Sequence, residues 1–97
     1  MMYKIKYLET IRRDREAIKA YLGQYSTTAT KRLFDKVKVK MELVKANPYM
    51  YESYKRRPKF RRIVVEDYLV FYKVIEESKT IEVHHIFHGM IDVEQYL

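Results

Sequence analysis

The stretch RRIVVEDYLVFYKV, residues 61–74, decides the fold of this 97-residue chain. Two segments rich in β-branched and aromatic residues are separated by Glu66 and Asp67, which is the pattern of a tight turn between two strands. A third such segment follows the turn-like EESK, residues 76–79. The spacing predicts two successive hairpins of an antiparallel sheet. The three predicted strands are Phe60–Glu66, Leu69–Ile75 and Thr80–Phe87.

The N-terminal half predicts one more strand and two helices. YKIKYLE, residues 3–9, alternates in the manner of a strand with one mostly polar face. Apolar residues then recur at helical spacing, and we expect a helix from Ile11 to Tyr25 with Thr10 as its cap. A second amphipathic helix follows the Ser26–Thr28 breakers and ends at Ala46, because Asn47 precedes a proline and so disfavours helix.

These elements predict an α+β domain with the order β-α-α-β-β-β, in which two helices pack on one face of a twisted, mainly antiparallel sheet. A chain of this length makes a single domain, residues 1–97, and 47% apolar residues suffice for a core. Residues 49–59, rich in tyrosine and basic residues, are expected to form a loop.

Composition narrows the functional classes. The absence of cysteine excludes disulfides and thiolate metal sites, and no apolar run approaches the ~20 residues that span a bilayer. A cytoplasmic location fits best. No Gly-rich phosphate loop and no Ser-His-Asp spacing is present, and we expect no cofactor. Because no apolar run is long enough to span a bilayer, we also expect no membrane partner. The net charge of +7 points to nucleic acid, the ribosome or an acidic protein as partner.

Most of that charge lies in SYKRRPKFRR, residues 53–62, where six of ten residues are Lys or Arg. Such a run is either a solvated loop or a surface for RNA, and neighbouring tyrosines favour RNA, because bases stack on aromatic rings while cations hold phosphates. Strand alternation places Arg62 with Phe60 and Val64, and Arg61 with Ile63 and Val65. The candidate RNA-binding residues are Tyr54, Lys55, Arg56, Arg57, Lys59 and Arg61.

Three histidines occur in VHHIFHG, residues 83–89. In a strand, four residues cover roughly 13 Å at ~3.3 Å each, which separates His84 from His88 too far for a shared metal, and we expect no metal site. Alternation places His85 on the face of the sheet opposite to that of His84 and His88, unless a bulge intervenes. His88 stands where the strand ends, and is either a structural residue or a reactive one.

The sequences NPYMYESYKRRPKFRRIVVEDYLVFYKV and KTIEVHHIFHGMID, together with the element order, resemble the RelE/ParE superfamily of type II toxin–antitoxin toxins. In that resemblance Arg62 falls on a catalytic Arg and His88 on a catalytic His of the YoeB-like branch. His85, Met90 and Ile91 stand where many relatives carry Arg. His85 is a further catalytic candidate at its position, and Glu52 is the candidate for the branch's acidic base.

The resemblance implies a toxin that an acidic antitoxin neutralises. RelE-like and YoeB-like members cleave mRNA in the ribosomal A site, by attack of a ribose 2′-OH on its own phosphate, and this is the activity we expect. In that interpretation His88→Ala removes most cleavage. ParE-like members instead inhibit DNA gyrase without catalysis, and the three missing Arg also leave open an inactive relic of the family.

Overall fold

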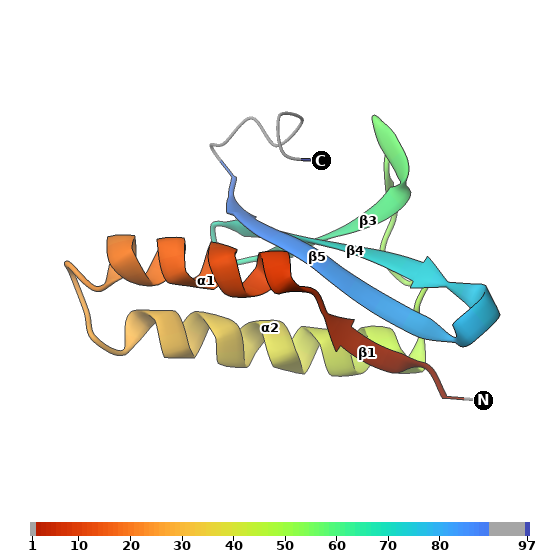
Figure 1. Cartoon of the computed structure of the whole chain (residues 1–97), viewed down its shortest axis with the longest axis horizontal. Coiled ribbons are helices and arrows are strands. Elements are labelled where there is room, and N and C mark those ends of the chain that lie inside the picture. The colour runs from red at the N-terminus through yellow and green to blue at the C-terminus, as the bar shows by residue number, and fades with distance from the viewer. Residues whose placement is uncertain (1, 90–96) are drawn as a thin grey trace.

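Two helices cover one face of a five-stranded sheet, whose strand order is β1-β5-β4-β3-β2 (Figure 1). The computed structural model describes residues 2–89 and 97. β1 pairs with β5 in parallel, and the other neighbouring strands are antiparallel. The elements are β1 (Lys4–Tyr7), α1 (Glu9–Leu22), α2 (Ala29–Ala46), β2 (Ser53–Tyr54), β3 (Arg57–Val65), β4 (Tyr68–Ile75), a 3-10 turn (Glu76–Ser78) and β5 (Thr80–His88).

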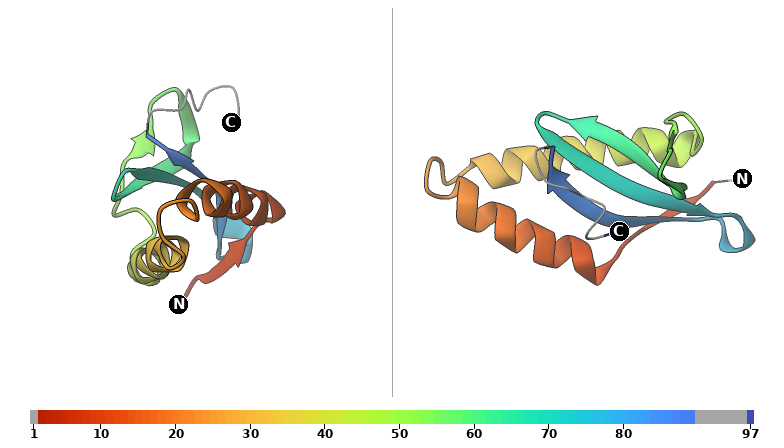
Figure 2. Two further views of the ribbon diagram at one scale, coloured as in Figure 1. Left: turned by 90° about the vertical axis from the view of Figure 1, so that its left-hand side faces the viewer. Right: turned by 90° about the horizontal axis from the view of Figure 1, so that it is seen from above.

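The predicted α+β class, the order of the long elements and the end of α2 at Ala46 are confirmed. Figure 2 shows the two helices side by side against the same face of the twisted sheet. We call this face of the sheet the inner face and the opposite face the outer face. Among the described residues, no helix is long and apolar enough to cross a membrane.

The core lies between the helices and the inner face. α1 buries Ile11 and Ile18 there, and α2 buries a stripe from Leu33 to Val44. Tyr72 of β4 is fully buried and its hydroxyl donates to the Pro48 carbonyl at 2.8 Å, which satisfies both polar groups. The strand residues in this core are Ile63, Val65, Tyr68, Val70, Tyr72, Ile81, Val83 and Ile86.

Two predictions about the first helix, its bounds and its cap, were wrong. It begins at Glu9 and ends at Leu22, not at Ile11 and Tyr25. Thr10 does not cap it; its hydroxyl donates instead to the backbone carbonyl of His84 in β5. Tyr21 and Tyr25 are exposed at the end of the helix and just beyond it, and their rings meet edge to face with centroids 5.6 Å apart.

The predicted loop at residues 49–59 was wrong in part. Ser53 and Tyr54 form the short strand β2, and β3 begins at Arg57 rather than at Phe60. Tyr54 pairs with Arg57, so Lys55 and Arg56 form a two-residue turn between the strands. The high charge of this segment hides its strand pattern, because a solvated hairpin needs no alternation of apolar residues.

A β-bulge at His84 changes the faces of the last strand. Phe71 pairs with His85 and Tyr72 pairs with Val83, so His84 is the extra residue on β5. Val83 and Ile86 consequently both face the inner core, whereas His84 and His85 both lie on the outer side. Of the two alternatives left open by the sequence, the bulge is therefore the correct one, and each residue after His84 lies on the face opposite to that expected from alternation alone.

Candidate functional site

The side chain of Asp14 brings α1 into contact with β5 beyond the bulge. β1 pairs with β5 only as far as Val83, and α1 then runs along the uncovered edge of β5. Asp14 Oδ2 accepts a hydrogen bond from the backbone N–H of Ile86 at 3.1 Å. The same oxygen lies 3.1 Å from Nδ1 of His85. The helix therefore replaces the missing strand neighbour and orients the His85 imidazole at the same time.

His85 and His84 are held differently. The His85 ring stacks on Phe87, with centroids 4.8 Å apart and planes 21° from parallel. The His84 ring meets Phe60 edge to face at 5.1 Å, and its Nε2 lies 3.1 Å from Glu82 Oε1. Burial lowers the pKa of His84, with the hydrogen bond to Glu82 acting in the opposite direction. His84 is therefore poised as a neutral imidazole near neutral pH, able to accept a proton.

Cations on the outer face lie against aromatic rings. Lys73 Nζ stands 4.6 Å from the centroid of Phe60, and Arg62 Cζ stands 5.5 Å from that of Tyr54. These rings belong to a small outer cluster built on Phe71, which is fully buried although it faces away from the helices. Cation–π contacts of this kind restrain a long side chain while its charged end stays available to a ligand.

Register places Arg62 and His85 on either side of Phe71. Arg62 of β3 and His85 of β5 each pair with that residue. With strands ~4.8 Å apart, their backbones are about 10 Å from each other, so a guanidinium and an imidazole could reach one phosphate from two sides. Beside them lies a depression of about 520 Å³, and its lining is Arg56, Arg57, Pro58, Lys59, Phe60, Lys73, His84, His85 and Leu97.

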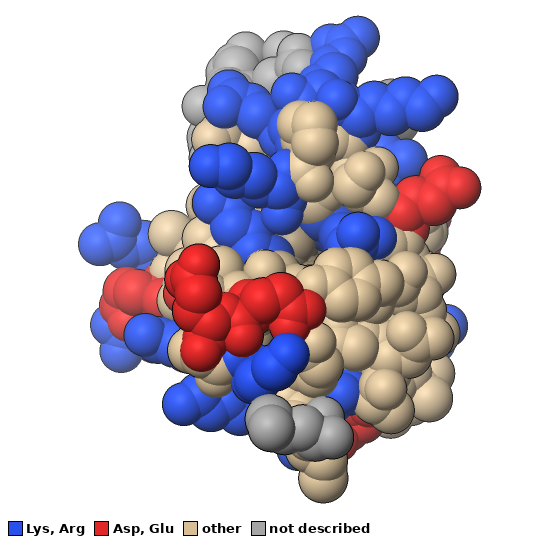
Figure 3. Space-filling view, turned by 90° about the vertical axis from the view of Figure 1, so that its right-hand side faces the viewer, with Lys and Arg blue, Asp and Glu red and all other residues tan. Residues whose placement is uncertain are grey.

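Charge is unevenly spread over the surface. Figure 3 shows Lys and Arg gathered over the upper part of one side, where the β2–β3 hairpin projects in Figure 1, and acidic side chains in a separate group below them. The hairpin residues Lys55, Arg56, Arg57 and Lys59 are all exposed. A basic projection beside a histidine-bearing face is suited to holding a polyanion.

The Arg61 side chain contacts the loop before β2 and is not part of the outer-face site. Its Nη1 donates to the backbone carbonyl of Tyr51, and its Cζ stands 4.7 Å from the centroid of Tyr49. Glu52 is exposed just ahead of β2, and β2 lies three strands from β5 in the sheet order. The structure therefore brings neither Arg61 nor Glu52 to the histidines.

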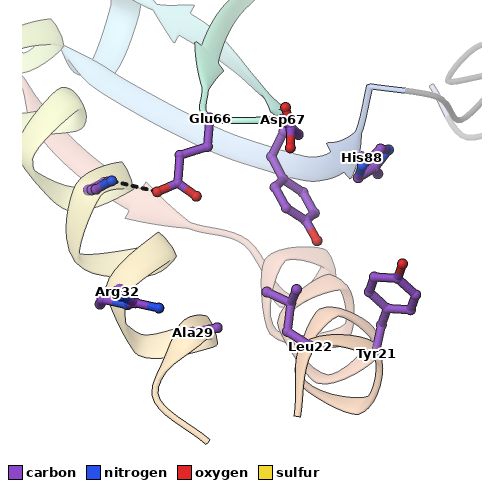
Figure 4. A pocket seen from close by; sticks show the side chains of 9 residues that line it. Tyr21, Leu22, Ala29, Arg32, Glu66, Asp67 and His88 are labelled. Atoms are coloured by element: carbon purple, nitrogen blue, oxygen red, sulfur yellow. Dashed lines mark hydrogen bonds and ion pairs between the residues drawn. The ribbon is translucent and has the colours of Figure 1, made fainter. Parts of the chain in front are cut away.

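His88 lies on the inner side, away from Arg62. It pairs with Tyr68, whose buried ring it meets edge to face at 5.3 Å. Figure 4 shows it at the mouth of a pocket of about 370 Å³ between the helix ends and the β3–β4 turn. The ion pair between Lys36 and Glu66, with 2.5 Å between the charged atoms, forms one side of this pocket. The structure thus separates His88 from Arg62, the pair that the resemblance joins.

The sequence analysis did not identify three residues that take part in the candidate site on the outer face: Asp14, Lys73 and His84. Asp14 gives no signal, because an acidic residue on a solvated helix is ordinary. Lys73 lies inside a strand that is otherwise apolar, and its place opposite the basic run could have been found from the alternation of β4. His84 drew attention only as a possible metal ligand.

Comparisons with known proteins agree on the fold. A family profile described as "ParE toxin of type II toxin-antitoxin system, parDE" matches residues 5–93. A chain of the chromosomal ParDE system of P. aeruginosa is similar in structure, with a TM-score of 0.72, 14% identity, and 90% of this chain and 96% of that chain covered. A search of curated protein sequences gives no match.

Two further solved structures share the fold. A mutant of the E. coli toxin RelE in the free state has a TM-score of 0.67 at 17% identity, with both chains covered completely. A chain of the RelBE2 toxin-antitoxin complex of Mycobacterium tuberculosis has a TM-score of 0.59 at 15% identity, with 91% of this chain and 99% of that chain covered. At these identities the similarity extends to the fold alone.

Proposed function

The chain belongs to the ParE toxin family of type II toxin–antitoxin systems, within the RelE/ParE superfamily, and from this premise we propose that it is a ribosome-dependent mRNA endoribonuclease. One observation carries the proposal: Arg62 and His85 flank Phe71 on the outer face, beside His84 and Lys73. A cation and two imidazoles on one rigid surface are the groups that phosphodiester transfer needs.

The reaction is an internal displacement at phosphorus. The ribose 2′ oxygen forms a bond to the adjacent phosphorus while the bond to the 5′ oxygen breaks, which leaves a 2′,3′-cyclic phosphate and a 5′ hydroxyl. One group removes the 2′ proton and another protonates the 5′ oxygen. His84, whose pKa is lowered by burial, suits the base, and His85 suits the acid. Arg62 and Lys73 offset the charge that develops on the phosphate oxygens.

The exposed hairpin holds the rest of the mRNA. Lys55, Arg56, Arg57 and Lys59 contact phosphates, while Tyr54 offers an aromatic ring at the edge of the site. The ribosome presents the mRNA as a single strand and supplies the remaining alignment. In this proposal His88 and Glu52 lie outside the reacting groups, because His88 lies on the inner side, away from Arg62, and Glu52 precedes β2, which lies three strands from the histidines of β5.

We propose an acidic antitoxin as the dedicated partner. Chains similar to this one were solved as parts of a ParDE system and of a RelBE2 toxin-antitoxin complex. The net charge of +7 favours a partner segment rich in Asp and Glu, and such a segment laid over the hairpin would exclude RNA. Both partners would meet in the cytoplasm, where translating ribosomes are found.

A second candidate is inhibition of DNA gyrase by binding alone. Two observations favour it: the family profile is that of ParE toxins, and Arg62 and His88 face opposite sides of the sheet. In that case the helices carry the contact and the histidines of β5 are structural. Stalled supercoiling, rather than cut mRNA, is then the expected effect.

Cell-free translation with the purified toxin tests the proposal. Cut sites on the mRNA are mapped by primer extension, with and without ribosomes, for the wild type and for His85→Ala, His88→Ala and Lys31→Ala. We expect cuts on translated mRNA only, lowered by about 100-fold or more in His85→Ala. Lys31, exposed on α2 and paired with Asp35, controls for loss of a surface side chain.

The outcomes separate the candidates. If His88→Ala abolishes cleavage while His85→Ala does not, the outer-face site is wrong and His88 carries the chemistry. If the wild type leaves translated mRNA intact, the nuclease proposal fails, and a supercoiling assay with purified gyrase decides between a gyrase inhibitor and an inactive relic.

A further inference from the structure

We infer that Asp14 is a positioning residue, which holds His85 in the tautomer with hydrogen on Nδ1 and so turns Nε2 toward RNA; the inference rests on the proposed function. Two hydrogen bonds converge on one atom, Asp14 Oδ2: one from the backbone N–H of Ile86 and one shared with Nδ1 of His85, both at 3.1 Å. Because a backbone N–H can only donate, the carboxylate oxygen is fixed as the acceptor.

The tautomer follows from that fixed acceptor. An oxygen already placed to accept from Ile86 can bond His85 only if Nδ1 carries the hydrogen. The Nε2 atom of the neutral ring is then an acceptor, and after protonation it is the donor. Asp14 and His85 expose only 18% and 17% of their side chains, so water competes weakly for the bond.

Stacking fixes the remaining freedom of the ring. The ring centroids of His85 and Phe87 lie 4.8 Å apart and the ring planes are nearly parallel, so rotation about the side-chain bonds of His85 is restricted. The charged and titratable residues that line the same depression beside His85 are Arg56, Arg57, Lys59, Lys73 and His84. Asp14 is thus the carboxylate that faces His85 from α1, whereas Glu82 bonds His84 from within β5.

A purely structural role for Asp14 makes a different prediction. Thr10 also bonds the uncovered edge of β5, through the backbone carbonyl of His84. If Asp14 only completed that edge, an amide oxygen at the same position would serve Ile86 equally well. Asp14→Asn therefore keeps an oxygen for the edge bond but replaces the carboxylate by a neutral amide. Its oxygen accepts less strongly from Nδ1–H, and its NH2 group can donate to an Nδ1 that carries no hydrogen, so the tautomer is no longer fixed.

Long-range proton–nitrogen NMR spectra of the full chain, labelled with ¹⁵N-histidine, report the tautomer of each histidine directly. The variants are Asp14→Asn, Asp14→Glu and the control Asp35→Asn on the exposed face of α2. Thermal unfolding of each variant shows whether the fold is kept. In parallel, kcat and KM for mRNA cleavage are measured on translating ribosomes.

We expect the Nδ1–H tautomer of neutral His85 in the wild type and in Asp35→Asn, and its loss or mixing with the Nε2–H form in Asp14→Asn. Cleavage by Asp14→Asn should fall at least ~10-fold in kcat with little change in KM, since an orienting carboxylate acts on the proton transfer. Asp14→Glu should restore part of the signal and of the rate, because it returns a carboxylate.

The inference would be overturned if neutral His85 carries its hydrogen on Nε2 in the wild type. It would also be overturned if the His85 signal is unchanged in a folded Asp14→Asn variant. The spectra need no activity, so they decide the role of Asp14 toward His85 even if the wild type cleaves nothing. A wild type that shows the Nδ1–H tautomer without cleavage contradicts the proposed nuclease, and leaves the ring geometry as a property of the fold.

Discussion

Arg62 and His85 pair with Phe71 from its two sides, and all three residues lie on the outer side of the sheet. Phe71 is fully buried beneath Tyr54, Phe60 and Phe87, so the two polar residues stand on a rigid aromatic base rather than on a mobile loop. Rigid support matters for catalysis, because a displacement of about 1 Å can cost ~100-fold in rate. The geometry of the candidate site is thus a consequence of the second, smaller hydrophobic cluster.

Deleting His84 tests the bulge on which this arrangement depends. Without that residue Val83 still faces inward, His85 outward and Ile86 inward, so the core keeps its side chains. We expect the variant to fold, with a dispersed NMR spectrum and a modest loss of stability. It should also lose cleavage if His84 is the base.

Deleting Glu82 instead serves as the contrasting variant. The residues before it, Thr80 and Ile81, are buried in the native strand, and their faces would change relative to Val83. We expect this variant to unfold or aggregate. Equal stability of the two deletion variants would contradict the assignment of the bulge to His84.

The bulge also marks the limit of what sequence patterns predict here. The strands β3 and β4 were predicted within a few residues, because Ile63, Val65, Val70 and Tyr72 alternate without interruption toward one core. The single extra residue in β5 leaves no composition signal, since His84 and His85 are both polar and both fit a half-buried strand. Its effect is nevertheless large, because it moves His88 to the inner face.

The candidate site was predictable only in part for a related reason. Alternation predicted that Arg62 shares a face with Phe60, and in the structure both lie on the outer face, with Arg62 over the ring of Tyr54. The contact between Asp14 and His85 joins residues 71 positions apart, and depends on the path of α1 along the edge of β5. No local pattern encodes such a pairing, so it becomes visible only in three dimensions.

The basic hairpin should govern the salt dependence of RNA binding. For a single strand, removing one cation that binds a phosphate lowers the slope of log K against log salt by ~0.7, so the double variant Arg57→Gln/Lys59→Gln should lower it by ~1.4. Lys4→Gln/Lys6→Gln, on exposed positions of β1 at the far edge of the sheet, provides the matched control.

The measurement is fluorescence anisotropy of a labelled single-stranded RNA, titrated with toxin at several salt concentrations. The control pair should leave the slope near that of the wild type, since it removes the same net charge elsewhere. An equal change in slope for both pairs would mean that net charge alone, and not the hairpin, attracts the RNA.

The hydroxyl of Tyr72 should contribute measurably to stability. It donates to the Pro48 carbonyl at 2.8 Å in a fully buried position, and burial raises the pKa of Tyr72 to about 12, so it remains a donor at all ordinary pH values. Tyr72→Phe leaves a buried acceptor without its donor, and should lower the free energy of unfolding by about 1–3 kcal/mol.

Urea denaturation followed by circular dichroism gives that difference. Tyr25→Phe removes the same hydroxyl from a residue that is 72% exposed, and should change stability by less than ~0.5 kcal/mol. If the two variants are equally stable, the bond between Tyr72 and Pro48 does not support the junction of α2 with the sheet.

Glu76 should make stability fall in acid. Its carboxylate accepts hydrogen bonds from Tyr49, from Lys79 at 2.9 Å and from Tyr3 at 2.7 Å, and these donors lower its pKa from 4.5 to about 2. A pKa that is lower in the folded state favours folding wherever the unfolded carboxyl is ionised. The contribution is therefore complete above pH 4.5 and diminishes as the pH falls toward about 2.

Thermal unfolding of the wild type and of Glu76→Gln between pH 2 and pH 6 tests this dependence. The gap in melting temperature should be widest near pH 6 and should close toward pH 2, and salt should narrow it because the cluster is solvent-exposed. Glu77→Gln, the exposed neighbour in the same turn, controls for the loss of one negative charge. A gap that stays constant with pH would show that Tyr49, Lys79 and Tyr3 do not hold the ionised carboxylate, and that the loop before β2 is tied to the β4–β5 turn by other contacts.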